Sequence, residues 1–272
     1  MDPFITFKMS HRGQTLKDLN KDSWDLDLSG IQPKRKLESE ISFISETLSN
    51  LQYKLYAENK KSLLVILQGV DASGKDGTIR HVMRALNPQN SYVKSFKIPN
   101  DEESSHDYLW RIHHSVPAKG QICIFNRSHY EDLVEPLING SISRKKLKQR
   151  YRQINDFERY LSENNIMFLK LFLYISKPEQ KKRLLERIHD PNKQWKISEG
   201  DLIAHKKWEQ YMSTYIDVFN HTNKKWAPWF IIPANVKYFR NWVVSKIILK
   251  ALEDIKPQFP RLSLDPQIFK LD

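Results

Sequence analysis

The chain has 272 residues, of which 40% are hydrophobic and 28% are charged, and its formal net charge is +12. This length is enough for one large domain with a substantial core. No apolar run approaches the roughly 20 residues of a membrane span. A single cysteine excludes an intrachain disulfide. The excess of positive charge indicates an anionic partner, which could be nucleic acid, a membrane surface or a polyphosphate. The first residues contain no signal-peptide pattern, so we expect a cytoplasmic protein.

Three segments are expected from composition and hydrophobic periodicity. Residues 1–34 read as a polar N-terminal arm, and residues 257–272 as an extended C-terminal tail. Between them, residues 35–256 form the main domain, with a lid around 178–200. That domain begins with a helix over residues 35–60, whose stripe of leucine and isoleucine predicts packing against a sheet or a second subunit.

A glycine-bounded loop at residues 69–77, Gly-Val-Asp-Ala-Ser-Gly-Lys-Asp-Gly, organises the chain. It follows the apolar run 63–68, which is typical of a buried parallel strand, and it precedes an amphipathic helix over residues 78–86. In this context the pattern predicts a phosphate-binding loop of the Walker A type rather than a simple turn. Its glycines let backbone N–H groups point inward, the helix N-terminus adds the positive end of its dipole, and Lys75 supplies a mobile charge.

Two acids distinguish this loop from the usual form, in which the lysine is followed by a Ser or Thr that binds magnesium. Asp76 follows Lys75, and Asp71 lies inside the loop. Two carboxylates beside a phosphate cradle would repel the substrate unless a cation lies between them, and magnesium commonly bridges carboxylates and phosphates. We therefore predict that Asp71 is a metal ligand. Asp76 has two interpretations of equal weight, a metal ligand or a helix N-terminal residue favoured by the dipole.

A second strand is expected at residues 92–96, and a helix starting at 99–103 then carries aromatic and basic side chains. No His-x-x-x-His pair on it has an adjacent Glu, which excludes a zincin-type zinc site. One interpretation is a nucleotide pocket, in which Trp110 stacks on a base and Arg111 holds phosphate. The alternative is an ordinary exposed helix face.

The third strand, over residues 120–125, ends in the polar run Asn-Arg-Ser-His-Tyr-Glu-Asp at 126–132. Ligands bind at the carboxyl ends of strands in such sheets, so these side chains are candidates for the site. Arg127 is suited to bidentate phosphate binding. Asn126 stands where many phosphate-loop enzymes have an acid that helps to hold magnesium.

A basic stretch over residues 178–198 follows the helix at 144–163 and the strand at 167–175. Arg183 and Arg187 are one helical turn apart on the same face, and the helix breaks at Asp190-Pro191. Such a basic hairpin can form a lid whose closure excludes water and completes a charge clamp. A solvated basic face is the alternative.

The remaining elements are an aromatic-rich helix at 199–221, a strand at 227–233 and a helix at 238–253. Strands that alternate with helices predict an α/β fold with a parallel sheet covered on both sides.

Six motifs in this order make the chain resemble the polyphosphate kinase 2 family over roughly residues 35–255. They are Gly-Val-Asp-Ala-Ser-Gly-Lys-Asp-Gly at 69–77, Asn-Pro-Gln at 87–89, His-Asp-Tyr-Leu-Trp-Arg at 106–111, Asn-Arg-Ser-His-Tyr-Glu-Asp at 126–132, Asp-Pro-Asn-Lys-Gln-Trp-Lys at 190–196 and Ala-Pro-Trp at 227–229. The resemblance implies a three-layer P-loop kinase fold related to thymidylate kinases, with a helical lid. It also implies Mg²⁺-dependent transfer of a terminal phosphoryl group between inorganic polyphosphate and adenine or guanine nucleotides, with Mn²⁺ as a possible substitute, by a homodimer or homotetramer.

The expected roles combine this resemblance with the reading of the residues. Catalytic roles fall to Asp71, Lys75, Arg127 and Arg187. Phosphate binding is assigned to Gly74, Lys75, Asp76, Gly77, Arg80, Arg127, Arg183, Arg187, Lys193 and Lys196. Nucleotide binding is assigned to His106, Trp110, Arg111, Asn126 and Glu131, and metal binding to Asp71 and Asn126.

Asn126 departs from the family pattern, since many members have Asp there, and Glu131 or Asp132 could supply the lost carboxylate. The subset with Asn resembles the class that accepts both AMP and ADP, so the expected reaction takes AMP to ADP and ADP to ATP. One rival is an ATP-dependent nucleoside or nucleotide kinase on the same fold. A nucleic-acid-binding module, suggested by basicity alone, ranks below it because such a module would leave the phosphate loop and Asp71 unexplained.

Overall fold

A five-stranded parallel sheet forms the centre of the computed structural model, which describes residues 2–9 and 33–261. The strands lie in the order β2-β3-β1-β4-β5, so the phosphate loop follows the middle strand. They are β1 (Ser62–Gln68), β2 (Ser91–Ser95), β3 (Ile122–Asn126), β4 (Ile166–Tyr174) and β5 (Trp229–Pro233). All seven residues of β1 are buried, as expected of a parallel strand covered on both faces.

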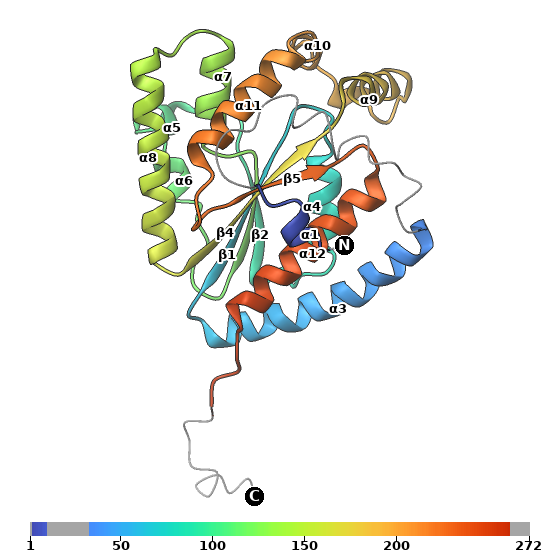
Figure 1. Ribbon diagram of the computed structural model, residues 1–272, viewed down its shortest axis with the longest axis vertical. Helices are drawn as coiled ribbons and strands as arrows, with labels where there is room; N and C mark the ends of the chain where they lie inside the picture. Colours follow the sequence, from blue (N-terminus) through green and yellow to red (C-terminus); the bar gives the residue numbers. More distant parts are fainter. Residues whose placement is uncertain (1, 10–32, 262–272) are drawn as a thin grey trace, which may run out of the picture.

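Helices cover both faces of the sheet, which confirms the predicted α/β class (Figure 1). One layer contains α3 (Lys34–Glu58), α4 (Lys75–Met83) and α12 (Lys237–Ile255). The other contains α7 (Glu131–Ile138), α8 (Arg144–Glu163) and α11 (Trp208–Thr222). In the part of the chain that the structure describes, no helix is long and apolar enough to cross a membrane.

The elements of the expected lid follow β4 and lie beyond its carboxyl end. They are α9 (Lys177–His189), the 3₁₀ turn η2 (Gln194–Lys196) and α10 (Glu199–Lys206). α9 is well defined at its start, because the Ser176 side chain accepts from the N–H of Glu179. The predicted helix over 199–221 is wrong in one respect, since the chain leaves helical geometry at Lys207, between α10 and α11.

The predicted helix after Pro99 is also wrong, because it is two short helices, α5 (Asp101–Ser105) and α6 (Trp110–His113). His106 is extended, with φ −104° and ψ 176°. Asp107 then accepts from the N–H of Leu109 at 2.9 Å. This local side-chain bond competes with the helix and starts a new turn.

The first described residues cover the free edge of β5. After the short helix α1 (Pro3–Thr6), the N–H of Met9 donates to Trp229 O and the N–H of Ile231 donates to Phe7 O, both at 2.9 Å. Phe7 and Met9 are buried, so this part of the expected polar arm protects an edge strand. Residues 10–32 of that arm and 262–272 of the tail lie outside the described residues.

Candidate active site

The loop between β1 and α4 has the backbone that a phosphate cradle requires. Gly69 and Gly74 have φ of +150° and +102°, which side-chain-bearing residues rarely adopt. A Cβ at residue 74 would also lie 2.0 Å from the Nη1 atom of Arg240. Glycine is therefore required there for two independent reasons.

Lys75, the first residue of α4, folds back onto its own loop. Its Nζ donates to Gly69 O at 2.7 Å and to Val70 O at 3.3 Å, and the residue is only 9% exposed. Burial lowers the pKa of this amine, and the nearby Asp71 offsets part of that effect. The ammonium group of Lys75, which the sequence predicted to be mobile, is thus held by two carbonyl oxygens. Phosphate oxygens could take the place of these carbonyls as its hydrogen-bond acceptors.

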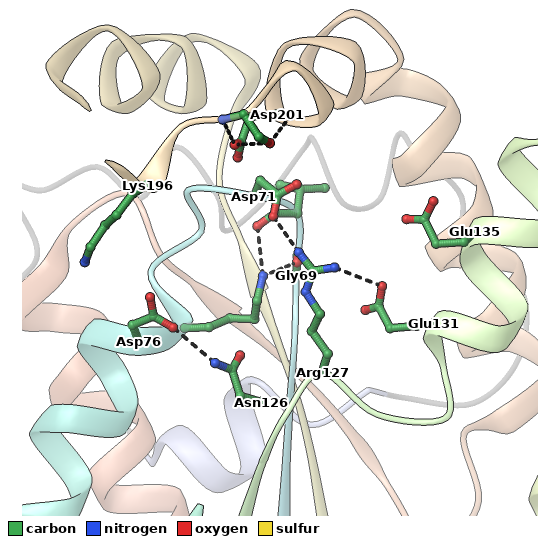
Figure 2. A network of polar contacts seen from close by, with 12 residues as sticks. Gly69, Asp71, Asp76, Asn126, Arg127, Glu131, Glu135, Lys196 and Asp201 are labelled. Atoms are coloured by element: carbon green, nitrogen blue, oxygen red, sulfur yellow. Dashed lines mark hydrogen bonds and ion pairs between the residues drawn. The ribbon is translucent and has the colours of Figure 1, made fainter. Parts of the chain in front are cut away.

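Arg127 joins the loop to the polar run after β3 (Figure 2). Its guanidinium contacts Asp71 at 2.8 Å and Glu131 at 3.5 Å. Burial alone would lower the pKa of Arg127, but Glu131 and Asp71 outweigh it and raise the pKa. Burial raises the pKa of Glu131 even though Arg127 opposes the shift. The φ of Arg127 is +63°, a strained value for such a residue, and strain of this kind gathers at functional sites.

Asn126 and Asp76 meet beside this cluster, on the side of α4 (Figure 2). The amide Nδ2 of Asn126 donates to Asp76 Oδ1 at 3.1 Å, across from Arg127. Its Oδ1 is buried and has no hydrogen-bond partner in the described part of the chain, which leaves an oxygen available for a cation.

These oxygens fit magnesium, which favours carboxylate and amide oxygens and usually completes its shell with water and substrate phosphates. Asp71 and Asp76 supply carboxylates, and Asn126 supplies the unpartnered oxygen. Within residues 2–9 and 33–261, no group of three or more His, Cys, Asp or Glu side chains is placed to hold a metal ion. Any metal here would therefore share its coordination with the substrate.

Arg183 has a different position from the expected phosphate contact, and we correct that assignment. Its guanidinium is buried behind the loop and uses all its donors on protein acceptors. The partners are Glu179 Oε1 at 2.7 Å, Ala72 O at 3.0 Å, Ser73 O at 3.1 Å, Ala234 O at 2.6 Å and Asn235 O at 2.9 Å. Arg183 therefore fixes the loop to the turn after β5.

Two of the other cations expected on the lid, Arg187 and Lys193, are paired with acids of the same segment. Arg187 is 22% exposed and lies 3.4 Å from Asp201 on α10, and Lys193 lies 2.5 Å from Asp190. Figure 2 shows Asp201 and Lys196 on the lid, beyond the loop that carries Asp71. Phosphate would have to compete with these acids. On α4, Arg80 is exposed, and Gly77 lies in the first turn.

The ring of Trp110, expected to stack on a nucleobase, stacks on two histidine rings in the structure, so a nucleobase would have to compete with them. The rings of His106 and His114 stack on it at centroid distances of 4.2 and 5.8 Å, with interplanar angles of 17° and 9°. Arg111 is likewise occupied, since it is buried between Glu103 at 3.2 Å and Asp132 at 3.6 Å.

A cavity of about 810 Å³ lies next to these residues, between the α5–α6 segment and α8. Polar and aromatic side chains line it, among them His106, Tyr108, Arg111, Asp132, Arg150 and Gln153. The Arg150 guanidinium lies 4.8 Å from the ring centroid of Tyr108. Burial raises the pKa of Asp132, despite the neighbouring Arg111 and Arg150. The sequence analysis assigned nucleotide binding to His106 and Arg111 but not to Tyr108 or Arg150, since the proximity of these residues arises from folding.

The chain is similar to known proteins over most of its length. Residues 32–260 match the family model "Polyphosphate kinase 2 (PPK2)". A Meiothermus ruber protein named AMP/ADP-polyphosphate phosphotransferase is 43% identical over 221 residues, which cover 81% of this chain and 83% of that protein. An ADP-polyphosphate phosphotransferase of Rhodopseudomonas palustris is 40% identical over 227 residues, covering 79% of this chain and 78% of its own. The crystal structure of a polyphosphate kinase 2 from Arthrobacter aurescens superposes with a TM-score of 0.92 at 37% identity, covering 98% of this chain and 94% of that one. The chain therefore belongs to the polyphosphate kinase 2 family.

Proposed function

We propose that this protein transfers the terminal phosphoryl group of inorganic polyphosphate to nucleotides, taking AMP to ADP and ADP to ATP. The observation that carries the proposal is the cluster of Lys75, Asp71 and Arg127 at the phosphate loop, beneath a cationic lid. The name of the Meiothermus ruber relative supports the same donor and both acceptors, and the name of the Rhodopseudomonas palustris relative supports the donor and ADP.

The roles of the residues follow from the charge of the reacting groups. Phosphoryl transfer needs positioning and charge neutralisation more than covalent chemistry by the protein. Lys75 would exchange its loop carbonyls for oxygens of the transferred group, and Arg127 would contact the same group from the β3 side. Arg187 would leave Asp201 for phosphate when the lid closes, which would also exclude water.

A magnesium ion is the metal that we propose, with oxygens of Asp71 and Asn126 as its protein ligands and Asp76 beside them. When bound, it supplies positive charge that neutralises the phosphate oxygens. The unpartnered Oδ1 of Asn126 supports this assignment.

The cavity beside α8 is our proposed site for the nucleoside of the acceptor. It is rimmed by Asp132, the residue after Glu131, so an acceptor there could extend its phosphates toward Arg127. Arg150 and Tyr108 provide donors and an aromatic surface for recognition.

The test is direct: incubate the protein with Mg²⁺, AMP and polyphosphate in the absence of ATP, and follow nucleotides by chromatography. ADP should rise and then fall as ATP accumulates. An absence of ADP would refute the polyphosphate donor, and a parallel reaction with ATP as donor would reveal an ATP-dependent kinase instead. Product that stops at ADP would refute the dual acceptor. Light scattering would test the expected homodimer or homotetramer.

Replacing Arg187 by alanine is expected to impair the use of polyphosphate by about two orders of magnitude in kcat/KM, since one charge-assisted phosphate contact in a partly dehydrated site is lost. The KM for the nucleotide should change much less. Arg159→Ala is a matched control, because Arg159 is an exposed arginine that pairs with Asp156 on α8. Unchanged kinetics for polyphosphate in the Arg187 variant would refute the lid assignment.

Replacing Asn126 by aspartate is expected to slow the step from ADP to ATP several-fold more than the step from AMP to ADP. The new carboxylate would face Asp76, whose oxygen now accepts from the Asn126 amide at 3.1 Å. The added negative charge should repel a diphosphate more than a monophosphate. The double variant Asn126→Asp/Asp76→Asn has the net charge of the wild type. It should therefore recover part of the rate of the ADP-to-ATP step relative to the AMP-to-ADP step. An unchanged ratio in the single variant would show that Asn126 does not set acceptor preference.

A further inference from the structure

Arg240 is a buried arginine without an acidic partner. It lies in the first turn of α12, and only 3% of its surface is exposed. Its Nε and Nη2 donate to Asn241 Oδ1 at 3.2 and 2.8 Å. In the described part of the chain no carboxylate lies within ion-pair distance of it, whereas the buried Arg111 and Arg183 both have one.

The guanidinium of Arg240 rests against the phosphate loop and the first turn of α4. A Cβ added to Gly77 would lie 3.4 Å from the Nη2 of Arg240, and a Cβ added to Gly74 would lie 2.0 Å from its Nη1. Within residues 2–9 and 33–261, Nη1 donates no hydrogen bond. The guanidinium of Arg183 reaches the same point, with its Nη1 at 3.6 Å from that Cβ position.

Two like charges side by side in a buried place are unfavourable unless an anion joins them. Burial, and then the charge of Arg183, lowers the pKa of Arg240 to about 10. The positive ends of two helices add to the field, since α4 begins at Lys75 and α12 begins at Lys237 without a side-chain cap. This flank of the loop is therefore electropositive, because Glu179 pairs with Arg183 and no carboxylate of the described residues pairs with Arg240.

We infer that Arg240 is a binding residue for the phosphate donor. Its free Nη1 would contact a phosphate of the polyphosphate that lies beyond the transferred phosphoryl group, which Lys75 and Arg127 bind. The inference rests on the proposed function and adds a donor subsite to it. The loop has two flanks: Arg127 and the Asp71 carboxylate lie toward β3, and Arg183 and Arg240 lie toward α12. If the acceptor nucleotide binds on the β3 side, the α12 side remains for the phosphates of the polyphosphate that follow the transferred group.

The same flank is unsuited to the base of a nucleotide donor. The turn after β5 offers the backbone carbonyls of Ala234 and Asn235, which could accept from the amino group of a base. Arg183 already occupies both, at 2.6 and 2.9 Å. A base would meet two guanidinium groups there, whereas a chain of phosphates would meet complementary charge. Arg240 therefore favours a polyphosphate over a nucleoside triphosphate as donor.

The test compares Arg240→Met, which removes the charge at similar length, with Arg240→Lys, which keeps it. With ADP saturating, the Met variant should raise the KM for long-chain polyphosphate about tenfold, while the KM for ADP stays within twofold of wild type. The Lys variant should recover most of the loss. Direct titration of polyphosphate without nucleotide should show the same order of affinity.

Three outcomes are informative. A wild-type KM for polyphosphate in the Met variant of an active enzyme would overturn this inference alone. An equal loss of kcat with both substrates and a lowered Tm, unrescued by Arg240→Lys, would overturn it in favour of a structural role. If wild-type enzyme makes no ADP from polyphosphate yet binds the polymer through Arg240, the proposed reaction fails while the subsite stands.

Discussion

Replacing Lys75 by methionine is expected to lower the rate of phosphoryl transfer by about three orders of magnitude, or about 4 kcal/mol of transition-state stabilisation. Lys75 lies within the loop, where its Nζ bonds to the carbonyls of Gly69 and Val70. Methionine fills a similar volume but cannot neutralise charge on the transferred group. The KM for the nucleotide should change little, because the lost interaction acts on the transferring phosphate.

The fold should survive this change, since the two carbonyl oxygens lie at a loop that is built to receive a ligand. Circular dichroism and Tm would check this, and Lys145→Met on the exposed surface of α8 provides the control for loss of a lysine. Turnover within tenfold of wild type would show that the transferring phosphate does not bind at this loop.

The sheet and the position of the loop could be predicted because their signals are local. An apolar run, a glycine loop and an amphipathic helix follow one another in the chain, and each is defined by its own residues. The strand and helix that flank the loop accordingly lie within three residues of their predicted limits, as β1 and α4. The meeting of Asp71, Arg127 and Glu131 could also be anticipated, since adjacent parallel strands place their carboxyl ends together.

Roles that depend on distant segments could not be predicted. The sequence pairs Arg183 with Arg187 on one helix face, but folding brings the phosphate loop and the turn after β5 against Arg183. Their carbonyls and Glu179 occupy all its donors. Trp110 resembles a free stacking residue until the break at His106 places an imidazole on its ring. Arg240 belongs to no motif, and its importance follows from its contact with Gly74, which is far away in the sequence.

A buried ion pair beneath the site gives a second large expected effect. Lys170, at the centre of β4, bonds to Glu158 of α8 at 2.7 Å, and neither side chain is exposed. The amine also donates to Tyr130 Oη and to Thr222 O, both at 2.8 Å. Burial would raise the pKa of Glu158, but Lys170 and His129 outweigh it and keep the carboxyl ionised.

This network explains why the run after β3 contains residues that do not reach the loop. His129 lies 3.4 Å from Glu158, and the Tyr130 hydroxyl donates to the same carboxylate at 2.8 Å. These two residues are buried directly between Arg127 and Glu131 in the chain. Anchoring them to α8 and β4 fixes the backbone that presents Arg127 in its strained conformation.

Replacing Lys170 by methionine should therefore destabilise the protein by about 3–5 kcal/mol, because Glu158 would be left as a buried charge without its partner. Urea unfolding followed by fluorescence would measure the loss. Adding Glu158→Gln to Lys170→Met removes the stranded charge and should recover most of the stability, as is common when a buried pair is replaced as a unit. If the single variant unfolds within 1 kcal/mol of wild type, or if the double variant is less stable than the single one, the pair does not hold the run after β3 in place. Recovery of stability without recovery of activity would instead show that the exact position of Arg127, and not the fold alone, depends on this ion pair.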